Sequence, residues 1–152
     1  MCTTKTPKLP LTAEERSCLR KAKIRLNQIA NLELKTLSDL MDITYDRARL
    51  LKGLATFQQI PSIGCRMAEN LVHYLGKYSF EDVRGENPAE LLDCLEKKLR
   101  TPVDPCVEDQ LRCVVYYAEN PDSKKQWFEF TAERKNYRER HGYPSSRPKP
   151  VG

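Results

Sequence analysis

Residues 60–71 are the segment of this chain whose residue types and spacing best suit a chemical task, the binding of an anion. An apolar turn that ends in Gly64 leads into a helical pattern that continues to Leu71. Glycine lets a phosphate approach the backbone, and the free amides that open the next helix donate to it, supported by the helix dipole. The predicted phosphate contacts are Ser62, Ile63, Gly64, Cys65, Arg66 and Met67.

A tight apolar turn between two short helices is typical of a helix-hairpin-helix unit, and this pattern indicates DNA as the partner. Arg66 adds a charge-assisted hydrogen bond on the first helical turn. Such contacts reach phosphates and not bases, so we expect binding that is independent of sequence and strongly dependent on salt. The basic residues expected to support it are Arg47, Arg49 and Lys52.

The same pattern recurs 20 residues earlier, in residues 40–51, where Ile43 aligns with Ile63 and Leu51 with Leu71. A recurrence at a fixed offset is typical of tandem structural units. The first copy has no glycine, and its Asp42 places a carboxylate where a phosphate would lie. We therefore expect the first unit to be a packing partner. Leucine and alanine at such spacings also occur in helical proteins without a repeat, which is the alternative.

Hydroxyl residues followed by acids or amides predict the helix starts around these units. The three expected starts are Thr36, Thr56 and Ser79, each with the spacing of a capping box or close to it. Together they place the tandem pair within about residues 36–83, with residues 53–55 as the connection between the two units.

The remaining elements are also predicted to be helical. Thr12 and Glu15 form a capping box for a first helix that extends to about Ala30. Gly76 ends the helix that follows Gly64, and proline at the first helical position is expected for helices that begin at Pro88 and Pro105. The predicted fold is therefore all-α, with a tandem helix-hairpin-helix (SAM-like) core and additional C-terminal helices.

Composition divides the chain of 152 residues into a helical domain with two ends of different character. Residues 1–10 are expected to be a disordered lead, and residues 11–120 the helical domain. Residues 121–142 are an aromatic and charged extension, and residues 143–152 a flexible tail. The aromatic cluster at residues 126–130 either stacks on single-stranded bases or docks a terminal helix onto the core, and docking is the favoured interpretation.

The net charge of +5 is unevenly distributed, because both ends are basic and the middle is acidic. Basic flanks suit a nucleic-acid partner, although lysine and arginine also serve simply to solvate helix faces. No apolar run approaches the roughly 20 residues of a membrane span, and the first residues lack the apolar core of a signal peptide. We expect a cytoplasmic protein without a membrane partner.

Catalytic, metal and cofactor chemistry have little support in the sequence. His73 and His141 stand without recognisable partners, and the six cysteines lack the short paired spacing of a metal site, so we expect no catalytic residues, no metal and no cofactor. The thiols are expected to be free and mostly buried in the core. Residues 104–113 are rich in functional groups, but an aspartate cap on an amphipathic helix explains most of them.

Several segments together resemble the bacterial pathogenicity-locus family, whose members are small helix-hairpin-helix proteins often labelled as mitomycin resistance proteins. The segments that carry the resemblance are residues 60–64, 67–68, 80–85, 88–91, 104–107 and 112–116. The resemblance covers about residues 56–120, and residues 127–134 are similar to the tails of some members. It implies an all-helical fold and a DNA partner, with no established activity. Ser62 stands where hairpins usually have their first glycine, which implies weaker phosphate binding.

Three hypotheses about function follow. The leading one is a non-enzymatic, sequence-nonspecific DNA-binding protein, an accessory in DNA repair, DNA uptake or mitomycin resistance. The second is a protein-interaction adaptor in which the hairpins are only a scaffold. The third is an enzyme that uses residues 104–113 in metal or thiol chemistry.

Overall fold

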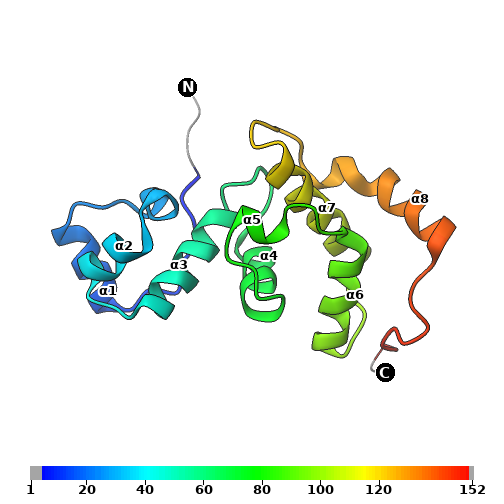
Figure 1. Ribbon diagram of the computed structural model, residues 1–152, viewed down its shortest axis with the longest axis horizontal. Coiled ribbons are helices and arrows are strands. Elements are labelled where there is room, and N and C mark those ends of the chain that lie inside the picture. Colours follow the sequence, from blue (N-terminus) through cyan, green and yellow to red (C-terminus); the bar gives the residue numbers. More distant parts are fainter. Residues whose placement is uncertain (1–4, 151–152) are drawn as a thin grey trace.

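The computed structural model describes residues 5–150, and this part of the chain is all-helical, without a strand. The elements are α1 (Ala13–Lys21), η1 (Leu26–Asn31), α2 (Leu34–Met41), α3 (Tyr45–Phe57), α4 (Cys65–Glu69), η2 (Asn70–Tyr74), α5 (Phe80–Val83), α6 (Pro88–Leu99), α7 (Pro105–Glu119), η3 (Trp127–Phe130) and α8 (Thr131–His141). Figure 1 shows an elongated molecule with α1 and α2 toward one end, α3, α4 and α5 in the middle, and α6 and α8 toward the other end. The 3-10 helices are η1 and η3, whereas η2 is a π-helical turn that continues α4.

Side-chain caps begin several helices as the sequence predicts. The Thr12 hydroxyl accepts from the Glu15 amide, and the Glu15 carboxylate accepts from the Thr12 amide, which completes the capping box of α1. Ser79 caps α5, and Asn87 and Asp104 cap α6 and α7 ahead of a proline. Each cap satisfies a backbone amide that has no partner inside its helix.

The first helix ends earlier than predicted, at Lys21 and not near Ala30. Lys23 adopts the left-handed conformation (φ 59°), and the Ile24 amide donates to the Leu19 carbonyl at 2.9 Å. These are the features of a Schellman motif at the C-terminus of α1. In this motif the residues at the positions of Leu19 and Ile24 are commonly apolar and lie close together. Because the left-handed residue is lysine and not glycine, no stop signal marks this position in the sequence.

Two of the three predicted helix starts are wrong. Thr36 lies inside α2, which begins at Leu34, and Thr56 is buried in the last turn of α3. The predicted connection at residues 53–55 is also wrong, because these residues are buried within α3. Gly53 is there for packing: an added Cβ would lie 3.2 Å from Val72 Cγ2 and 3.3 Å from the Tyr78 backbone.

One hydrophobic core extends from α1 to η3, with α3 at its centre. The buried side chains of α3 include Leu51, Leu54 and Phe57. Aromatic contacts then connect α3 to α5 and α7, since the rings of Phe57 and Phe80 are 5.9 Å apart and those of Phe80 and Tyr117 are 5.3 Å apart. The core thereby fixes the positions of the connections on either side of α3.

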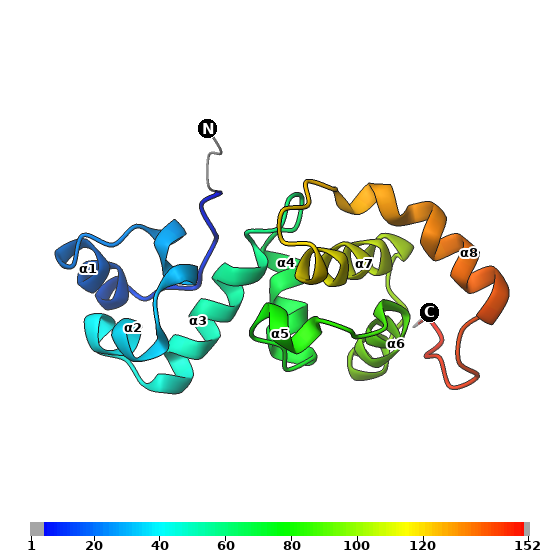
Figure 2. The same cartoon turned by 45° about the horizontal axis from the view of Figure 1, so that its top comes forward.

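The C-terminal helix α8 is attached by charged side chains, because it has no buried residue of its own. It follows η3 directly and extends to one end of the molecule (Figure 2). Three carboxylates of α6 and α7 are buried, and each is paired with an arginine of α8 or of the residues that follow it. The pairs are Asp109 with Arg134 (2.7 Å), Glu108 with Arg138 (2.8 Å) and Glu96 with Arg147 (2.8 Å).

The described parts of the two ends make specific contacts. Pro7 and Leu9 are buried, and the Lys8 backbone exchanges two hydrogen bonds with the Gln58 side chain, each at 2.9 Å. At the other end, the Arg147 guanidinium lies 3.7 Å from the centre of the Tyr143 ring. Within residues 5–150, no helix combines the length and the apolar character needed to cross a membrane.

Candidate functional site

Two connections on either side of α3 share one backbone pattern. We call residues 42–44, between α2 and α3, the first turn, and residues 58–64, between α3 and α4, the second turn. Asp42 (φ 53°) and Ser62 (φ 65°) both adopt the left-handed conformation. Thr44 and Gly64 are then the extended N-cap residues of α3 and α4. The 20-residue recurrence in the sequence therefore corresponds to two similar connections that share α3.

The second turn is closed by a residue far away in the sequence. The Lys5 ammonium donates to the carbonyl oxygens of Ile60 (2.8 Å) and Ile63 (3.0 Å). The Ile63 amide also donates to the Ile60 carbonyl at 3.1 Å, and both isoleucine side chains are fully buried. Partial burial lowers the pKa of Lys5. The sequence offers no signal for this contact, which spans 55 residues.

Ser62 connects the second turn to the C-terminal part of the chain. Its hydroxyl donates to the Pro61 carbonyl and accepts from the Trp127 amide at 2.9 Å. The left-handed conformation costs a serine about 1–2 kcal/mol, and these two bonds help to hold it. The hydroxyl of this predicted phosphate contact is thus already engaged within the protein.

The start of α4 leaves backbone donors open. Gly64, the N-cap, has an extended backbone and no side chain to cap the helix, so the amides of Cys65, Arg66 and Met67 have no acceptor among the described residues. No atom lies within 4 Å of the position that a Cβ on Gly64 would occupy. Open amides beside an unobstructed glycine are suited to an anion.

The predicted contacts at the second turn therefore divide into two groups. The side chains of Ile63 and Met67 are buried and anchor the turn in the core. The Arg66 side chain is exposed, with no hydrogen bond or ion pair to a described residue. Arg66 and the open amides are thus the groups that remain available to a ligand.

The first turn is less suited to an anion. The Thr44 hydroxyl accepts from the Arg47 amide at 3.1 Å, so the chain itself caps α3. Asp42 is exposed and carries its carboxylate at the turn. A phosphate bound at this position would have to displace the Thr44 hydroxyl from the Arg47 amide and overcome repulsion by the Asp42 carboxylate.

The three basic residues predicted to support the site have contacts within the protein. Arg47 forms two hydrogen bonds with Glu15, each at 2.9 Å, and donates to the Pro10 carbonyl. Lys52 donates to a backbone carbonyl at 2.6 Å. The Arg49 guanidinium lies 4.0 Å from the centre of the Tyr78 ring. The structure does not bring these side chains together with Arg66 in a common contact.

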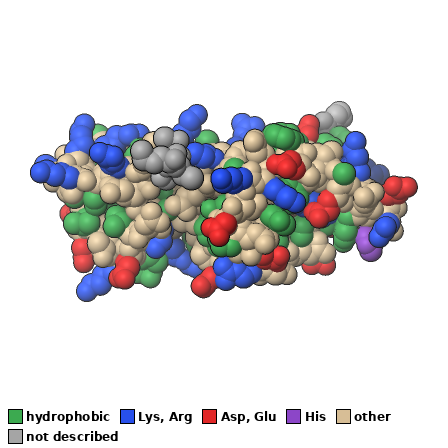
Figure 3. Space-filling model, turned by 90° about the horizontal axis from the view of Figure 1, so that it is seen from above, with side chains coloured by type: hydrophobic (Ala, Val, Ile, Leu, Met, Phe, Trp, Pro, Cys, Tyr) green, Lys and Arg blue, Asp and Glu red, His purple; other side chains and the backbone are tan. Residues whose placement is uncertain are grey.

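Exposed lysines and arginines gather elsewhere, over the end of the molecule that contains α1 (Figure 3). They belong to α1 and the residues that follow it: Arg16, Arg20, Lys21, Lys23 and Arg25. This basic surface raises the local concentration of anions without selecting one.

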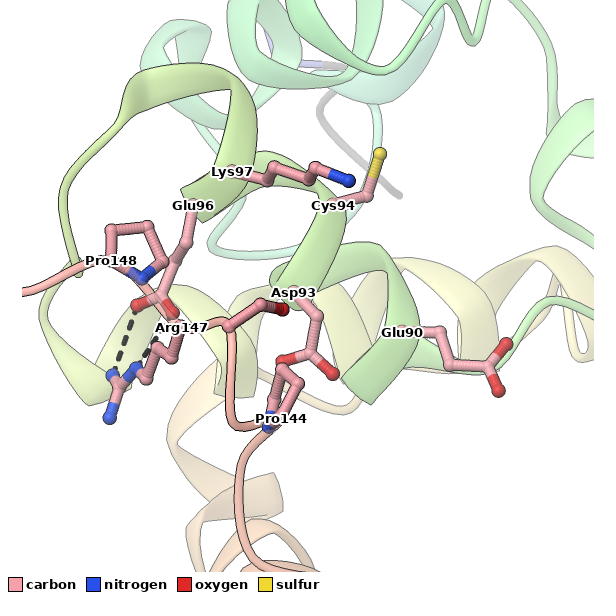
Figure 4. A pocket seen from close by; sticks show the side chains of 9 residues that line it. Glu90, Asp93, Cys94, Glu96, Lys97, Pro144, Arg147 and Pro148 are labelled. Carbon is pink, nitrogen blue, oxygen red and sulfur yellow. Dashed lines mark hydrogen bonds and ion pairs between the residues drawn. The ribbon is translucent and has the colours of Figure 1, made fainter.

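A cavity of about 330 Å³ lies between α6 and the C-terminal residues. Two of the acids that line it, Asp93 and Glu96, are already paired, as Figure 4 shows for Glu96 and Arg147. The Glu96 carboxylate also accepts from the Val103 amide, and Asp93 is paired with Arg138. Among the described residues no group of three His, Cys, Asp or Glu is placed to hold a metal ion. The cavity therefore presents no free acid pair.

The segment 104–113 has a structural role at the start of α7. Asp104 caps this helix through the Cys106 amide, and burial raises the pKa of the Cys106 and Cys113 thiols to about 11. Glu108, an acid in the first turn of α7, and its neighbour Asp109 are also the buried partners of arginines in α8. Arginines four residues apart, at 134 and 138, are the signal that could have indicated this pairing.

The cysteines are less buried than expected. Cys113 is buried, Cys18, Cys65 and Cys106 are half-buried, and Cys94 is exposed, so the expectation of mostly buried thiols is wrong. Cys2 lies outside the described residues. The two histidines are exposed, and His141 packs on the ring of Tyr137 at 4.3 Å.

Comparison with known proteins identifies the family. The family described as pathogenicity locus (Cdd1) matches residues 50–136. The matched region contains most of α3, the second turn, α4 and α7. No curated protein and no solved structure matches the chain. Because the match covers more than half of its residues, the chain belongs to the pathogenicity-locus family.

Proposed function

We propose that the protein binds the phosphate backbone of DNA without sequence preference, and that the second turn and the start of α4 hold the phosphate. In this proposal the two turns, which share α3, are a tandem pair of helix-hairpin-helix units. The observation that carries it is the set of open amides at Cys65, Arg66 and Met67 beside an unobstructed Gly64 and the exposed Arg66 guanidinium. Amide donors, a cation and a helix N-terminus together suit one phosphate group.

The biological setting belongs to the same proposal. An accessory role in DNA repair or in mitomycin resistance, exercised in the cytoplasm, would need contact with DNA of any sequence. Contacts to phosphates alone provide this, because they carry no direct information about the bases. The basic surface around α1 supports the proposal by attracting the polyanion over a longer range.

The first experiment uses two substitutions in the proposed phosphate site. Gly64→Asp is compatible with the extended backbone (φ −104°) and with the open space at this position. Aspartate is a good N-cap residue, so it should satisfy the amides of α4 and preserve the fold while its charge repels phosphate. Arg66→Glu replaces the exposed guanidinium at this site with a carboxylate. We expect each variant to lose at least about tenfold in affinity for random duplex at low salt.

The matched control is Lys35→Glu, which makes the same charge change as Arg66→Glu at an exposed position on α2. It should retain most of the affinity. The slope of log affinity against log salt should fall by about 0.9 for each phosphate contact that is lost. Equal affinities for Arg66→Glu and Lys35→Glu, in folded proteins, would contradict the proposed site.

A second candidate function, a protein-interaction adaptor, is favoured by one observation at the first turn. Leu40 and Tyr45 flank this turn and are 42% and 56% exposed, among the few large apolar side chains at the surface of the described residues. Such a pair suits a protein partner better than a phosphate. Leu40→Ser combined with Tyr45→Ser should abolish a protein contact here and leave DNA binding unchanged.

A further inference from the structure

Two aromatic residues stand at the start of η3, which contacts the second turn through its backbone, and neither takes part in the phosphate contact. Trp127 and Phe128 begin η3, and their ring centres are 5.9 Å apart at an angle of 78°. Phe130, at the end of η3, is buried against Tyr116. Phe128 is instead 55% exposed, and Trp127 is half-buried. The segment is therefore anchored by one ring while it presents another to the solvent.

The start of η3 is attached directly to the second turn. The Trp127 amide donates to the Ser62 hydroxyl at 2.9 Å, across 65 residues of sequence. Figures 1 and 2 both show the stretch that leads into η3 beside the connection between α3 and α4. Gly64 follows Ser62 by two residues, so their Cα atoms are at most about 7.6 Å apart. The residue that precedes Phe128 in the chain thus contacts the turn that leads to the proposed phosphate site.

Basic residues belong to the two segments that meet at the second turn. Arg66 is on the α4 side, and Lys5 closes the turn. Before η3, Lys124 and Lys125 are exposed, and the Lys125 ammonium lies 4.7 Å from the centre of the Tyr116 ring. The nearest acid in η3, Glu129, accepts from the Gln126 amide at 2.8 Å as the helix cap. The charge around the rings therefore suits a polyanionic strand.

We propose that Phe128, supported by Trp127, is a stacking surface for an unpaired DNA base on a strand whose phosphate is held at the start of α4. This inference rests on the proposed function and adds a substrate class to it: DNA in which a duplex adjoins a single-stranded segment. A base inside an uninterrupted duplex is stacked on its neighbours and has no free face to offer. Stacking of a free base on an aromatic side chain tolerates any sequence, as phosphate binding does.

The test compares two DNA probes, a blunt duplex and the same duplex with a single-stranded extension, by fluorescence anisotropy at one fixed salt concentration. The wild-type protein should bind the extended probe more tightly. Phe128→Ala should lower affinity for the extended probe about tenfold and leave affinity for the blunt duplex unchanged. Phe128→Trp, which keeps a stacking face, should restore the preference.

The control substitution is Tyr45→Ala, which removes an aromatic side chain of almost the same exposure (56%) from the first turn. It should leave both affinities unchanged. Trp127 is the only tryptophan in the chain, so its fluorescence reports on this site alone. Its emission should change more on addition of the extended probe than on addition of the blunt duplex.

The outcomes separate this inference from the proposed function. If the wild-type protein binds duplex in a salt-dependent way but Phe128→Ala affects both probes equally or neither, the stacking site is wrong and phosphate binding stands. If the wild-type protein binds neither probe, both proposals are overturned. A preference for the extended probe that depends on Phe128 supports both.

Discussion

The Lys5 ammonium lies 2.8 Å from the carbonyl oxygen of Ile60, so a residue near the start of the chain closes the turn that precedes α4. Its second bond, to the Ile63 carbonyl at 3.0 Å, bridges the two ends of the short loop. Carbonyls that point inward at a tight turn need a donor, and here a flexible cationic side chain supplies it.

Replacement of this lysine should loosen the turn. We expect Lys5→Met, which keeps the aliphatic stem, to lower the free energy of unfolding by about 1–3 kcal/mol, because two backbone carbonyls lose a charged donor. Urea denaturation followed by circular dichroism measures this. Lys8→Met is the control, since the Lys8 contacts with Gln58 use the backbone. A Lys5 variant as stable as the Lys8 variant would show that the bridge does not stabilise the turn.

The contact between α1 and α3 should make stability depend on pH. Hydrogen bonds from Arg47 hold the pKa of Glu15 below its ordinary value of 4.5. Between the folded and unfolded pKa values the unfolded chain binds more protons, so stability is present above about pH 4.5 and is lost as the pH falls through the folded pKa. Glu15→Gln should cost about 1–2 kcal/mol at neutral pH and flatten this part of the curve. Denaturation midpoints between pH 7 and about pH 3 test this.

The buried carboxylates should make α8 sensitive to single substitutions. Arg138 donates to Glu108, which is fully buried, and to Asp93. Arg138→Met should destabilise the protein by about 2–4 kcal/mol, because Arg112 is then the one partner that Glu108 keeps among the described residues. Adding Glu108→Gln to that variant should recover part of the loss. Arg140→Met, at an exposed position of α8, should change stability by less than about 0.5 kcal/mol.

The thiols should differ in reactivity. With a pKa of about 11, Cys106 and Cys113 carry a thiolate fraction on the order of 10⁻⁴ at pH 7. Alkylation by iodoacetamide, followed by mass spectrometry of peptides, should therefore label the exposed Cys94 before Cys106 and Cys113. If Cys106 were labelled as fast as Cys94, the hypothesis of an enzyme that uses thiol chemistry in residues 104–113 would be supported.

Local signals predicted most of the helices, because caps and stops depend on neighbouring residues. The box formed by Thr12 and Glu15 and the left-handed Gly76 are examples. The same local logic failed at Thr36 and Thr56, since a hydroxyl three residues before an acid or amide also occurs inside helices. It failed at Lys23 because the left-handed residue there is not a glycine.

The candidate site was predicted in part. The offset of 20 residues placed Asp42 and Ser62 at equivalent positions, and both are left-handed. The contacts from Lys5 and Trp127 to the second turn were not foreseen, because they span 55 and 65 residues and follow only from the packing of the whole chain. Phosphate binding at the second turn stays a prediction.

The sharing of α3 between the two turns has a geometric consequence. A helix of 13 residues is about 20 Å long at 1.5 Å per residue. The length of α3 therefore sets the separation between the first turn and the second turn. Along the axis of a DNA duplex, where one strand rises by about 3.4 Å per nucleotide, this length corresponds to about six base-pair steps. A protein partner bound at Leu40 and Tyr45 would therefore lie at a fixed distance from DNA bound at Arg66.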